Sequence, residues 1–172
     1  HSFAQGKIMP SVNPNTVADG LKTSLGEKTF PIIHALVEGI ITVSEEEIIS
    51  EIEKGNKDKI TKGIIVQLPL PENLNKEKII NAISPDKDVD GLTATNLWNL
   101  MNDGSGIIPA TALAVDTLLK EYDLDVVGKH VVIVGDSILV GKPMAIHFLN
   151  RDATVTICHD KTRDLANFTK QA

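Results

Sequence analysis

Residues 130–160 read HVVIVGDSILVGKPMAIHFLNRDATVTICHD, and this stretch decides the fold class. Two runs rich in β-branched residues, His130–Val134 and Thr154–Cys158, predict strands. A helix over about Pro143–Asn150 is expected between them. A strand, a helix and a second strand in this order indicate a parallel pair joined by a crossover helix.

The loop after the first strand, Gly135–Pro143, has features of a phosphate-binding turn. Gly135 and Gly141 permit a tight turn and close backbone approach, and the N-terminus of the following helix presents free N–H groups to an anion. Pro143 suits a first helical turn. The spacing differs from G-x-G-x-x-G, so an ordinary turn between strand and helix is the alternative.

Asp160 lies just past the second strand. An acidic side chain at this place can accept hydrogen bonds from the ribose hydroxyls of a dinucleotide. The alternative is that Asp160 caps the turn that follows.

The remaining chain also alternates between helical and strand patterns, which predicts an α/β protein with mostly parallel strands. Ser44–Glu47 is typical of a capping box, with the helix ending at about residue 54 near Gly55. Few signals are present between Ser84 and Pro109, a segment of the kind that carries functional loops. The other expected elements are Phe30–Val37 as strand or helix, Gly63–Gln67 as a strand buried on both faces, helices over Asn75–Ile83 and Ala112–Tyr122, and a helix that begins at Asp164.

Gln67 is expected at the carboxyl end of the buried strand, where open parallel sheets place their ligands. The rigid Leu68–Pro71 segment follows it. Asp86, Asp88 and Asp90 form an acidic turn with a spacing that resembles calcium loops, but the other ligands of such a loop are absent. A solvated acidic turn is the alternative. The five histidines have no ligand spacing, so no metal site is expected.

Composition excludes several classes of protein. The chain has 172 residues and a net charge of −6, which disfavours a nucleic-acid partner. No apolar run is long enough to span a bilayer, and no signal peptide is visible. Cys158 is the single cysteine, so a disulfide framework is excluded and a reducing, cytoplasmic setting is expected.

Four motifs in order carry a family resemblance. They are GIIVQLPLP at 63–71, PDKDVDG at 85–91, GDSILVGKP at 135–143 and ATVTICHDKT at 153–162. Together they resemble the methylenetetrahydrofolate dehydrogenase/methenyltetrahydrofolate cyclohydrolase family. The resemblance implies a catalytic, folate-binding α/β domain over 1–108 and a Rossmann-type NAD(P)-binding domain over 109–172, with a cleft between them and further strands beyond residue 172. It also implies a homodimer.

The family resemblance implies a reaction and a set of site residues. The reaction is oxidation of 5,10-methylenetetrahydrofolate with NAD or NADP, then hydrolysis to 10-formyltetrahydrofolate. Gln67 resembles the glutamine that positions the catalytic lysine, Asp90 resembles the aspartate that anchors the pterin, and Val66 and Leu68 would flank the folate. The positions that would contact the cofactor are Gly135, Asp136, Ser137, Gly141, Lys142, Pro143, His159 and Asp160.

The chain departs from the family pattern near its N-terminus. The Tyr-x-x-x-Lys motif falls on Asp19 and Thr23, and Lys22 lies one position away. The single tyrosine of the chain is Tyr122. The Phe expected after Asp-Gly is Leu92, and Pro-Cys-Thr-Pro-x-Gly reads PATALA at 109–114.

These departures keep two other functions open. One is a non-catalytic folate- or dinucleotide-binding relative of the same fold, and the other is a Rossmann oxidoreductase that acts on a different small molecule. For the cofactor, we expect NAD to be preferred, because Asp136 and Asp160 stand where NADP-dependent relatives carry Arg and Ser. Carboxylates there repel a 2′-phosphate.

Overall fold

The computed structural model describes residues 2–12, 24–41, 43–44, 47–102 and 105–172. The chain divides into two units: unit 1 comprises His1–Glu51 and Val66–Ile79, and unit 2 comprises Ile52–Ile65 and Ile80–Ala172. Asp19, Lys22 and Thr23, the residues predicted to occupy and adjoin the Tyr-x-x-x-Lys positions, lie outside the described residues.

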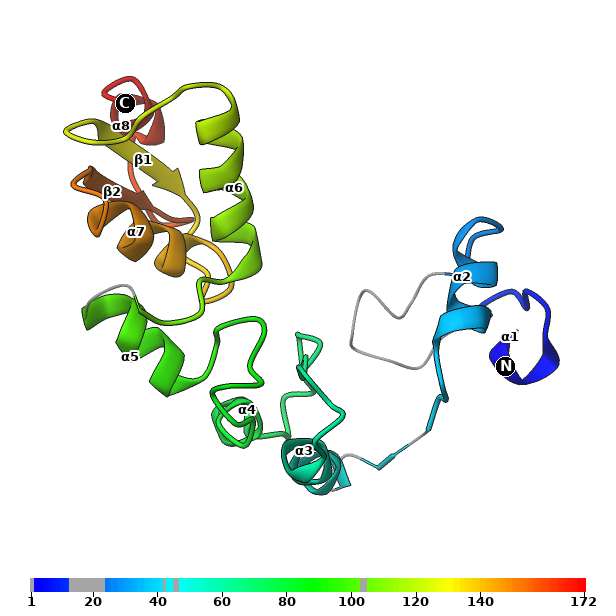
Figure 1. Ribbon diagram of the computed structural model, residues 1–172. Helices are drawn as coiled ribbons and strands as arrows, with labels where there is room; N and C mark the ends of the chain where they lie inside the picture. Colours follow the sequence, from blue (N-terminus) through cyan, green and yellow to red (C-terminus); the bar gives the residue numbers. More distant parts are fainter. Residues whose placement is uncertain (1, 13–23, 42, 45–46, 103–104) are drawn as a thin grey trace. The chain divides into compact units, whose positions relative to one another are not determined.

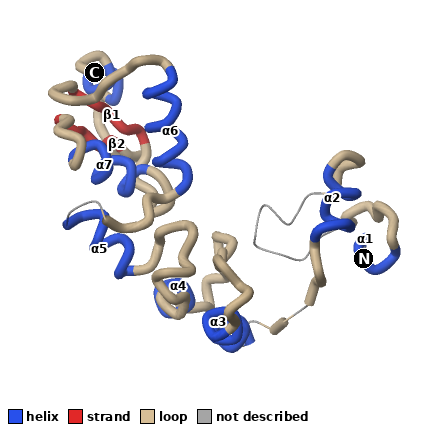
Figure 2. Tube along the Cα trace, viewed as in Figure 1, coloured by secondary structure: helices blue, strands red, loops and turns tan. Residues whose placement is uncertain are grey.

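Unit 2 is built on a parallel pair of strands, β1 (His130–Val134) and β2 (Thr154–Cys158). Their register pairs His130 with Thr154 and Val134 with Cys158. Both strands have the predicted bounds, and the predicted parallel pairing is confirmed (Figures 1 and 2). The connecting helix α7 (Gly141–Leu149) begins two residues before the predicted start at Pro143, because the chain turns into the helix directly at Gly141.

The core of unit 2 lies between this pair and its helices. Helix α7 packs against both strands and against α6 (Ala110–Glu121), which confirms the predicted helix there. The buried side chains of this core are Ala112, Val126, Ile133, Met144, Ala145, Phe148 and Ala153. Helix α8 (Leu165–Thr169) follows β2, with Asp164 at its N-cap position as predicted.

The prediction of a buried strand over Gly63–Gln67 is wrong. Ile64 forms a single parallel bridge with Asp88, in which Ile64 N donates to Lys87 O at 2.7 Å. Ile65 is 63% exposed. The partner segment is a turn that offers one bridge only, and no second strand flanks Ile64 within the described ranges, so an apolar run alone does not make a ladder.

Helix α3 (Ile48–Lys57) runs past its predicted end at residue 54. Lys87 explains the extension, since its Nζ donates to the carbonyl oxygens of Gly55, Asn56 and Asp58 at 2.8, 2.8 and 2.6 Å. A cation on these carbonyls stabilises the last turn in place of a glycine stop. At the other end, Ser44 N donates to Glu47 Oε2 at 2.7 Å, as expected of a capping box.

Helix α5 (Ala94–Asn102) lies in the segment 84–109, which has few sequence signals for helix or strand. The Oγ1 of Thr93 accepts from Asn96 N at 3.3 Å at its first turn, and Leu100 is buried. The segment Phe30–Val37, expected as strand or helix, is a helix, α2 (Thr29–Leu36). Helix α4 (Lys76–Ile80) is shorter than the predicted helix over Asn75–Ile83. A short helix, α1 (Ser2–Gln5), begins the described chain. No helix in the described ranges has the length and apolar character needed to cross a membrane.

Candidate functional site

The loop between β1 and α7 is a tight backbone turn that depends on two glycines. Gly135 has φ +122°, a conformation that other residues rarely adopt. At Gly141 a Cβ would collide with the carbonyl oxygen of Gly135, so the turn closes only with glycine there. The two ends of the loop therefore lie against each other at the carboxyl end of β1.

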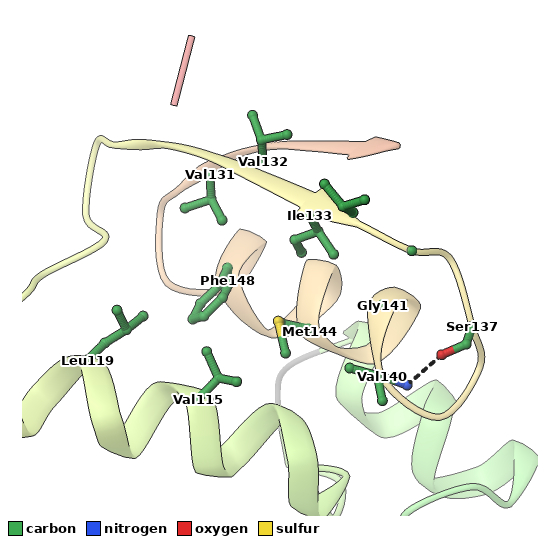
Figure 3. A pocket seen from close by; sticks show the side chains of 12 residues that line it. Val115, Leu119, Val131, Val132, Ile133, Ser137, Val140, Gly141, Met144 and Phe148 are labelled. Atoms are coloured by element: carbon green, nitrogen blue, oxygen red, sulfur yellow. Dashed lines mark hydrogen bonds between the residues drawn. The ribbon is translucent and has the colours of Figure 1, made fainter. Parts of the chain in front are cut away.

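Ser137 organises the middle of this loop (Figure 3). Its Oγ accepts from Val140 N at 3.1 Å, and its carbonyl oxygen accepts from Lys142 N at 3.0 Å. The hydroxyl hydrogen of Ser137 stays available for donation. A serine hydroxyl, backbone N–H groups and the N-terminus of α7 in one turn can together bind a phosphate. Lys142 is exposed beside them, whereas Pro143 is buried in the first turn of the helix.

His159 and Asp160 extend from the carboxyl end of β2 and are both exposed. The turn is closed by Thr162 Oγ1, which accepts from His159 N at 2.8 Å, and by His159 Nδ1, which accepts from Lys161 N at 3.1 Å. The Asp160 carboxylate instead pairs with Lys161 Nζ at 3.1 Å. Asp160 therefore does not make the capping bond that the alternative interpretation requires. Asp136, in the loop after β1, is also exposed.

A cavity of about 470 Å³ lies beneath β1 and reaches this loop. Val131 and Ile133 point from β1 toward α7, and Val115 and Leu119 extend from α6 (Figure 3). The cavity is also lined by Val132, Val134, Gly135, Ser137, Val140, Gly141, Met144 and Phe148. Apart from the loop residues, this lining is apolar.

The acidic turn places its three carboxylates in different surroundings. Asp88 is 1% exposed and accepts from Leu92 N at 3.2 Å, from Thr93 N at 2.7 Å and from Asn96 Nδ2 at 3.0 Å. Burial alone would raise the pKa of Asp88, but these donors, led by Asn96, hold that pKa below its usual value. The interpretation of a solvated turn is thus wrong for Asp88. Asp86 is exposed and accepts from Ser84 Oγ.

Asp90 is half-buried, and its carboxylate has no hydrogen-bond or ion-pair partner among the residues that the structure describes. Burial raises the pKa of Asp90, and the neighbouring charge of Asp88 raises it further. A carboxylate of this kind can receive the paired N–H groups of a ligand.

Gln67 belongs to unit 1 and is exposed, between the half-buried Val66 and Leu68. Its Nε2 donates to Leu68 O at 2.9 Å, which fixes the amide group and leaves Oε1 as an available acceptor. Asp90 and the loop residues belong to unit 2. Leu92 is buried, and Tyr122 is 75% exposed just after α6.

Sequence reasoning missed two groups of polar residues. Thr93 and Asn96 hold Asp88, and the T-x-x-N spacing before Leu97 was the available signal. Asp116 on α6 is 1% exposed and receives Arg151 Nη1, Lys120 Nζ at 2.8 Å and His147 Nε2 at 3.2 Å. No periodic pattern in the sequence indicates this cluster. Within the described ranges, no three His, Cys, Asp or Glu side chains are placed to hold a metal ion.

Comparison with known proteins matches two segments of the chain to the domains of one family. Residues 32–90 match the family model of the tetrahydrofolate dehydrogenase/cyclohydrolase catalytic domain. Residues 109–172 match the model of the NAD(P)-binding domain of the same family.

Individual relatives agree with these matches. The bifunctional protein FolD of Enterococcus faecalis is 47% identical over 131 residues, which is 76% of this chain and 47% of that protein. The FolD of Bacillus cereus is 43% identical over 141 residues, 82% of this chain and 49% of that protein. The chain thus spans about half the length of the curated relatives it matches.

Solved structures show the same fold. The Campylobacter jejuni FolD dehydrogenase/cyclohydrolase aligns with a TM-score of 0.72 and 44% identity, over 76% of this chain and 47% of that one. The Trypanosoma brucei FolD, solved with NADP and an inhibitor, aligns with a TM-score of 0.71 and 34% identity, over 76% of this chain and 46% of that one. The predicted α/β class with a Rossmann-type unit is therefore confirmed.

Proposed function

The chain belongs to the tetrahydrofolate dehydrogenase/cyclohydrolase family, and we propose that it binds NAD or NADP at the Gly135–Gly141 loop and a one-carbon tetrahydrofolate near Asp90. The proposed reaction is oxidation of 5,10-methylenetetrahydrofolate to the 5,10-methenyl form, followed by hydrolysis to 10-formyltetrahydrofolate. In this proposal residues 1–108 form the catalytic, folate-binding domain and residues 109–172 the cofactor domain. A cytoplasmic homodimer is part of the same proposal.

The observation that carries cofactor binding is the close approach of Gly135 and Gly141. Since a Cβ on Gly141 would meet backbone atoms, the turn requires glycine, and it places the Ser137 hydroxyl beside the start of α7. Such a turn fits a pyrophosphate. The nicotinamide, once bound, supplies the hydride acceptor, and the chain's own contribution is orientation and electrostatics.

Isothermal titration of NAD and NADP into the protein tests this site. We expect Gly141→Ala to abolish measurable binding of both cofactors, because the added Cβ forces the loop open. Gly39→Ala is the matched control, since nothing lies within 4 Å of a Cβ there. Unchanged cofactor affinity in a folded Gly141→Ala protein would remove the assignment.

For the folate, the proposal assigns a role to each polar residue of the motifs. Asp90 would accept the amino and ring N–H groups of the pterin, which its unpartnered carboxylate supports. Val66 and Leu68 would flank the folate, and Gln67 would position a catalytic lysine through Oε1. His159 and Asp160 would contact the adenosine ribose beyond β2, with Asp136, Lys142 and Pro143 beside the phosphate turn.

We propose that NAD is preferred over NADP. Asp136 and Asp160 are exposed carboxylates beside the proposed ribose position, and they can accept from a free 2′-OH but repel a 2′-phosphate. Lys161 pairs with Asp160 and offsets part of this repulsion. Asp136→Arg with Asp160→Ser should shift the ratio of the two dissociation constants toward NADP. Tighter NADP than NAD binding by the unmodified protein, in phosphate-free buffer, would contradict the preference.

A second candidate function is that of a non-catalytic folate- or dinucleotide-binding relative. The observation that favours it is the presence of Asp19 and Thr23 where the family has Tyr and Lys. Separate assays of methylenetetrahydrofolate oxidation and methenyltetrahydrofolate hydrolysis distinguish the two. Binding of NAD and folate without either turnover would establish the second function.

A further inference from the structure

Lys87 is a half-buried cation to which the proposed function assigns no role. Its Nζ donates to three main-chain carbonyl oxygens, those of Gly55, Asn56 and Asp58, at 2.8, 2.8 and 2.6 Å. An ammonium group has three N–H donors, so these carbonyls use all of its hydrogen-bonding capacity. The side chain therefore links the end of α3 to the acidic turn, residues 85–91.

The loop that supplies these carbonyls is itself held in place. The Asn56 side chain binds the segment before the acidic turn, because its Nδ2 donates to Ala82 O at 2.7 Å and its Oδ1 accepts from Ser84 N at 2.9 Å. Further along, the Asp58 carboxylate accepts from Ile60 N at 3.0 Å. The ammonium group is thus bound to a loop that has hydrogen bonds of its own.

The main chain of Lys87 continues this link into the turn. Lys87 N donates to Ser84 O at 2.8 Å. Its carbonyl oxygen accepts from Ile64 N at 2.7 Å and from Val89 N at 3.1 Å. Both the side chain and the backbone of Lys87 therefore determine where the chain enters the part of the turn that contains Asp90.

The chain that follows Asp90 is anchored separately. Gly91 N donates to Asp88 O at 3.2 Å, and Gly91 has φ +66°. A Cβ at Gly91 would collide with Ile107 O, so the backbone lies close to that carbonyl group. Asp90 thus lies between two anchors, and among the described residues its own carboxylate takes part in neither.

We propose that Lys87 is a positioning residue for folate binding: by linking the acidic turn to the end of α3, it holds the Asp90 carboxylate where it meets the N–H groups of the pterin. This inference rests on the proposed folate site and adds a residue to it. Burial and the charge of Asp88 raise the pKa of Asp90, whereas a cation that acted on Asp90 by its charge would lower that pKa. Lys87 therefore contributes position.

Titration calorimetry with tetrahydrofolate, in oxygen-free buffer, tests the proposal. Tetrahydrofolate carries the pterin N–H groups but no one-carbon unit, so it reports binding without turnover. We expect Lys87→Met to raise the dissociation constant about tenfold or more, since the turn then adopts the competent arrangement only part of the time. Lys62→Met is the matched control and should leave the affinity unchanged, because Lys62 Nζ donates within its own loop, to Lys59 O at 3.1 Å.

A double-mutant cycle with Asp90→Ala separates positioning from other roles. If Lys87 acts through Asp90, Lys87→Met should weaken binding by less than about twofold once residue 90 is already alanine. A direct contact between Lys87 and the ligand, or a general loss of structure, would give the full loss in both backgrounds.

A second readout needs no folate and decides where Asp90→Ala binds too weakly to titrate. Carboxyl NMR of the free protein measures the pKa of Asp90, which burial raises. Release of the turn by Lys87→Met should expose the carboxylate and lower this pKa toward about 3.9. Loss of a positive charge alone would shift the pKa upward, so the sign distinguishes position from charge.

Circular dichroism shows whether Lys87→Met folds. If it does not, Lys87→Arg takes its place, because a planar guanidinium group cannot direct its donors at three converging carbonyls as an ammonium group does. The expected loss of tetrahydrofolate affinity is then smaller, with the same dependence on Asp90.

Three outcomes would overturn the proposal while leaving the folate site in place. They are an unchanged affinity in the folded Lys87 variant when Asp90→Ala is weakened, equal losses in both backgrounds of the cycle, and an Asp90 pKa that stays or rises in the Lys87 variant. Unchanged affinity in Asp90→Ala is a different result, since it would remove the proposed pterin site and this inference with it.

Discussion

Asp86, Asp88 and Asp90 alternate along one short turn, yet each carboxylate has a different chemical role. Asp86 accepts from a neighbouring serine at the surface, Asp88 is buried among donors that hold the turn, and Asp90 is half-buried without a partner in the described chain. The two residues between them hold the turn in place, since Lys87 O accepts from Ile64 N at 2.7 Å and the Val89 side chain lies against Gly63. Asp90 alone is left with the properties of a ligand-binding group.

We expect Asp90→Ala to weaken folate binding by about 2–4 kcal/mol, because charge-assisted hydrogen bonds are lost and the pterin donors go unmet. Asp86→Ala, at the exposed end of the same turn, is the control and should leave folate affinity unchanged. Calorimetric titration of both variants measures the difference. Equal affinities would show that the pterin is anchored elsewhere.

The pH dependence of folate affinity gives a second readout on Asp90. Its pKa is raised by burial and by Asp88, and only the ionised carboxylate accepts paired N–H groups. Folate affinity should therefore fall on acidification at a higher pH than the ordinary aspartate value of about 3.9. A midpoint below that value would contradict the role.

For single residues, the sequence identified the polar candidates for a site. It did not predict which groups surround each of these side chains. Asp88 and Asp90 are equivalent in the sequence pattern, and only the positions of Thr93 and Asn96 separate a structural carboxylate from an available one. The glycines of the loop were predictable, because close backbone approach excludes every other residue type.

Sequence patterns predicted helices and strands correctly where elements that are consecutive in the sequence also pack on each other in space. β1, α7 and β2 are consecutive and pack on each other, so the bounds of both strands and the presence of the helix follow from the pattern. The run Gly63–Gln67 failed because a strand needs partners that the sequence does not name. Helix α3 extends beyond its glycine because Lys87, distant in the sequence, binds its last carbonyls.

The Asp116 cluster joins α6 to α7, the helix that follows the Gly135–Gly141 loop. Burial would raise the pKa of Asp116, but the hydrogen bond from Lys120 and the nearby Arg151 and His147 hold it below its usual value. His147 Nε2 lies 3.2 Å from Asp116 Oδ2 without an aligned hydrogen bond, so Lys120 and Arg151 are the main partners.

We expect Asp116→Asn to lower the free energy of unfolding by about 2–4 kcal/mol, since Lys120 and Arg151 lose their buried counter-charge. Glu121→Gln, an exposed change on the same helix, should cost less than about 0.5 kcal/mol. Because the folded pKa of Asp116 is lowered, its contribution is present above about pH 4 and is lost as the pH falls further. Urea unfolding at pH 7 and pH 3 measures both effects. If the free energies of unfolding of the unmodified protein and of Asp116→Asn differed by the same amount at pH 7 and at pH 3, the charge argument would be contradicted.

For the whole molecule, the two proposed activities place different demands on the chain. Hydride transfer depends mainly on the relative orientation of cofactor and folate, whereas hydrolysis needs a positioned group that assists attack by water. The cofactor turn and Asp90 are present. In our proposal, Thr23 stands at the position of the family's catalytic lysine. Under the proposed assignment, the chain retains the residues for binding and orientation and lacks one for hydrolysis.

Cyclohydrolase turnover should accordingly be reduced by a factor of about 100 or more relative to the Enterococcus faecalis FolD, with dehydrogenase turnover less affected. Thr23→Lys with Asp19→Tyr should raise hydrolysis of methenyltetrahydrofolate, because Gln67 then has an ammonium group to position. Adding Gln67→Ala should remove that gain, since the lysine would lose its partner. Lys22→Met in the unmodified chain is the control, as this lysine lies one position off the motif. Full cyclohydrolase turnover in both the unmodified chain and the Lys22→Met variant would show that another group performs the hydrolysis.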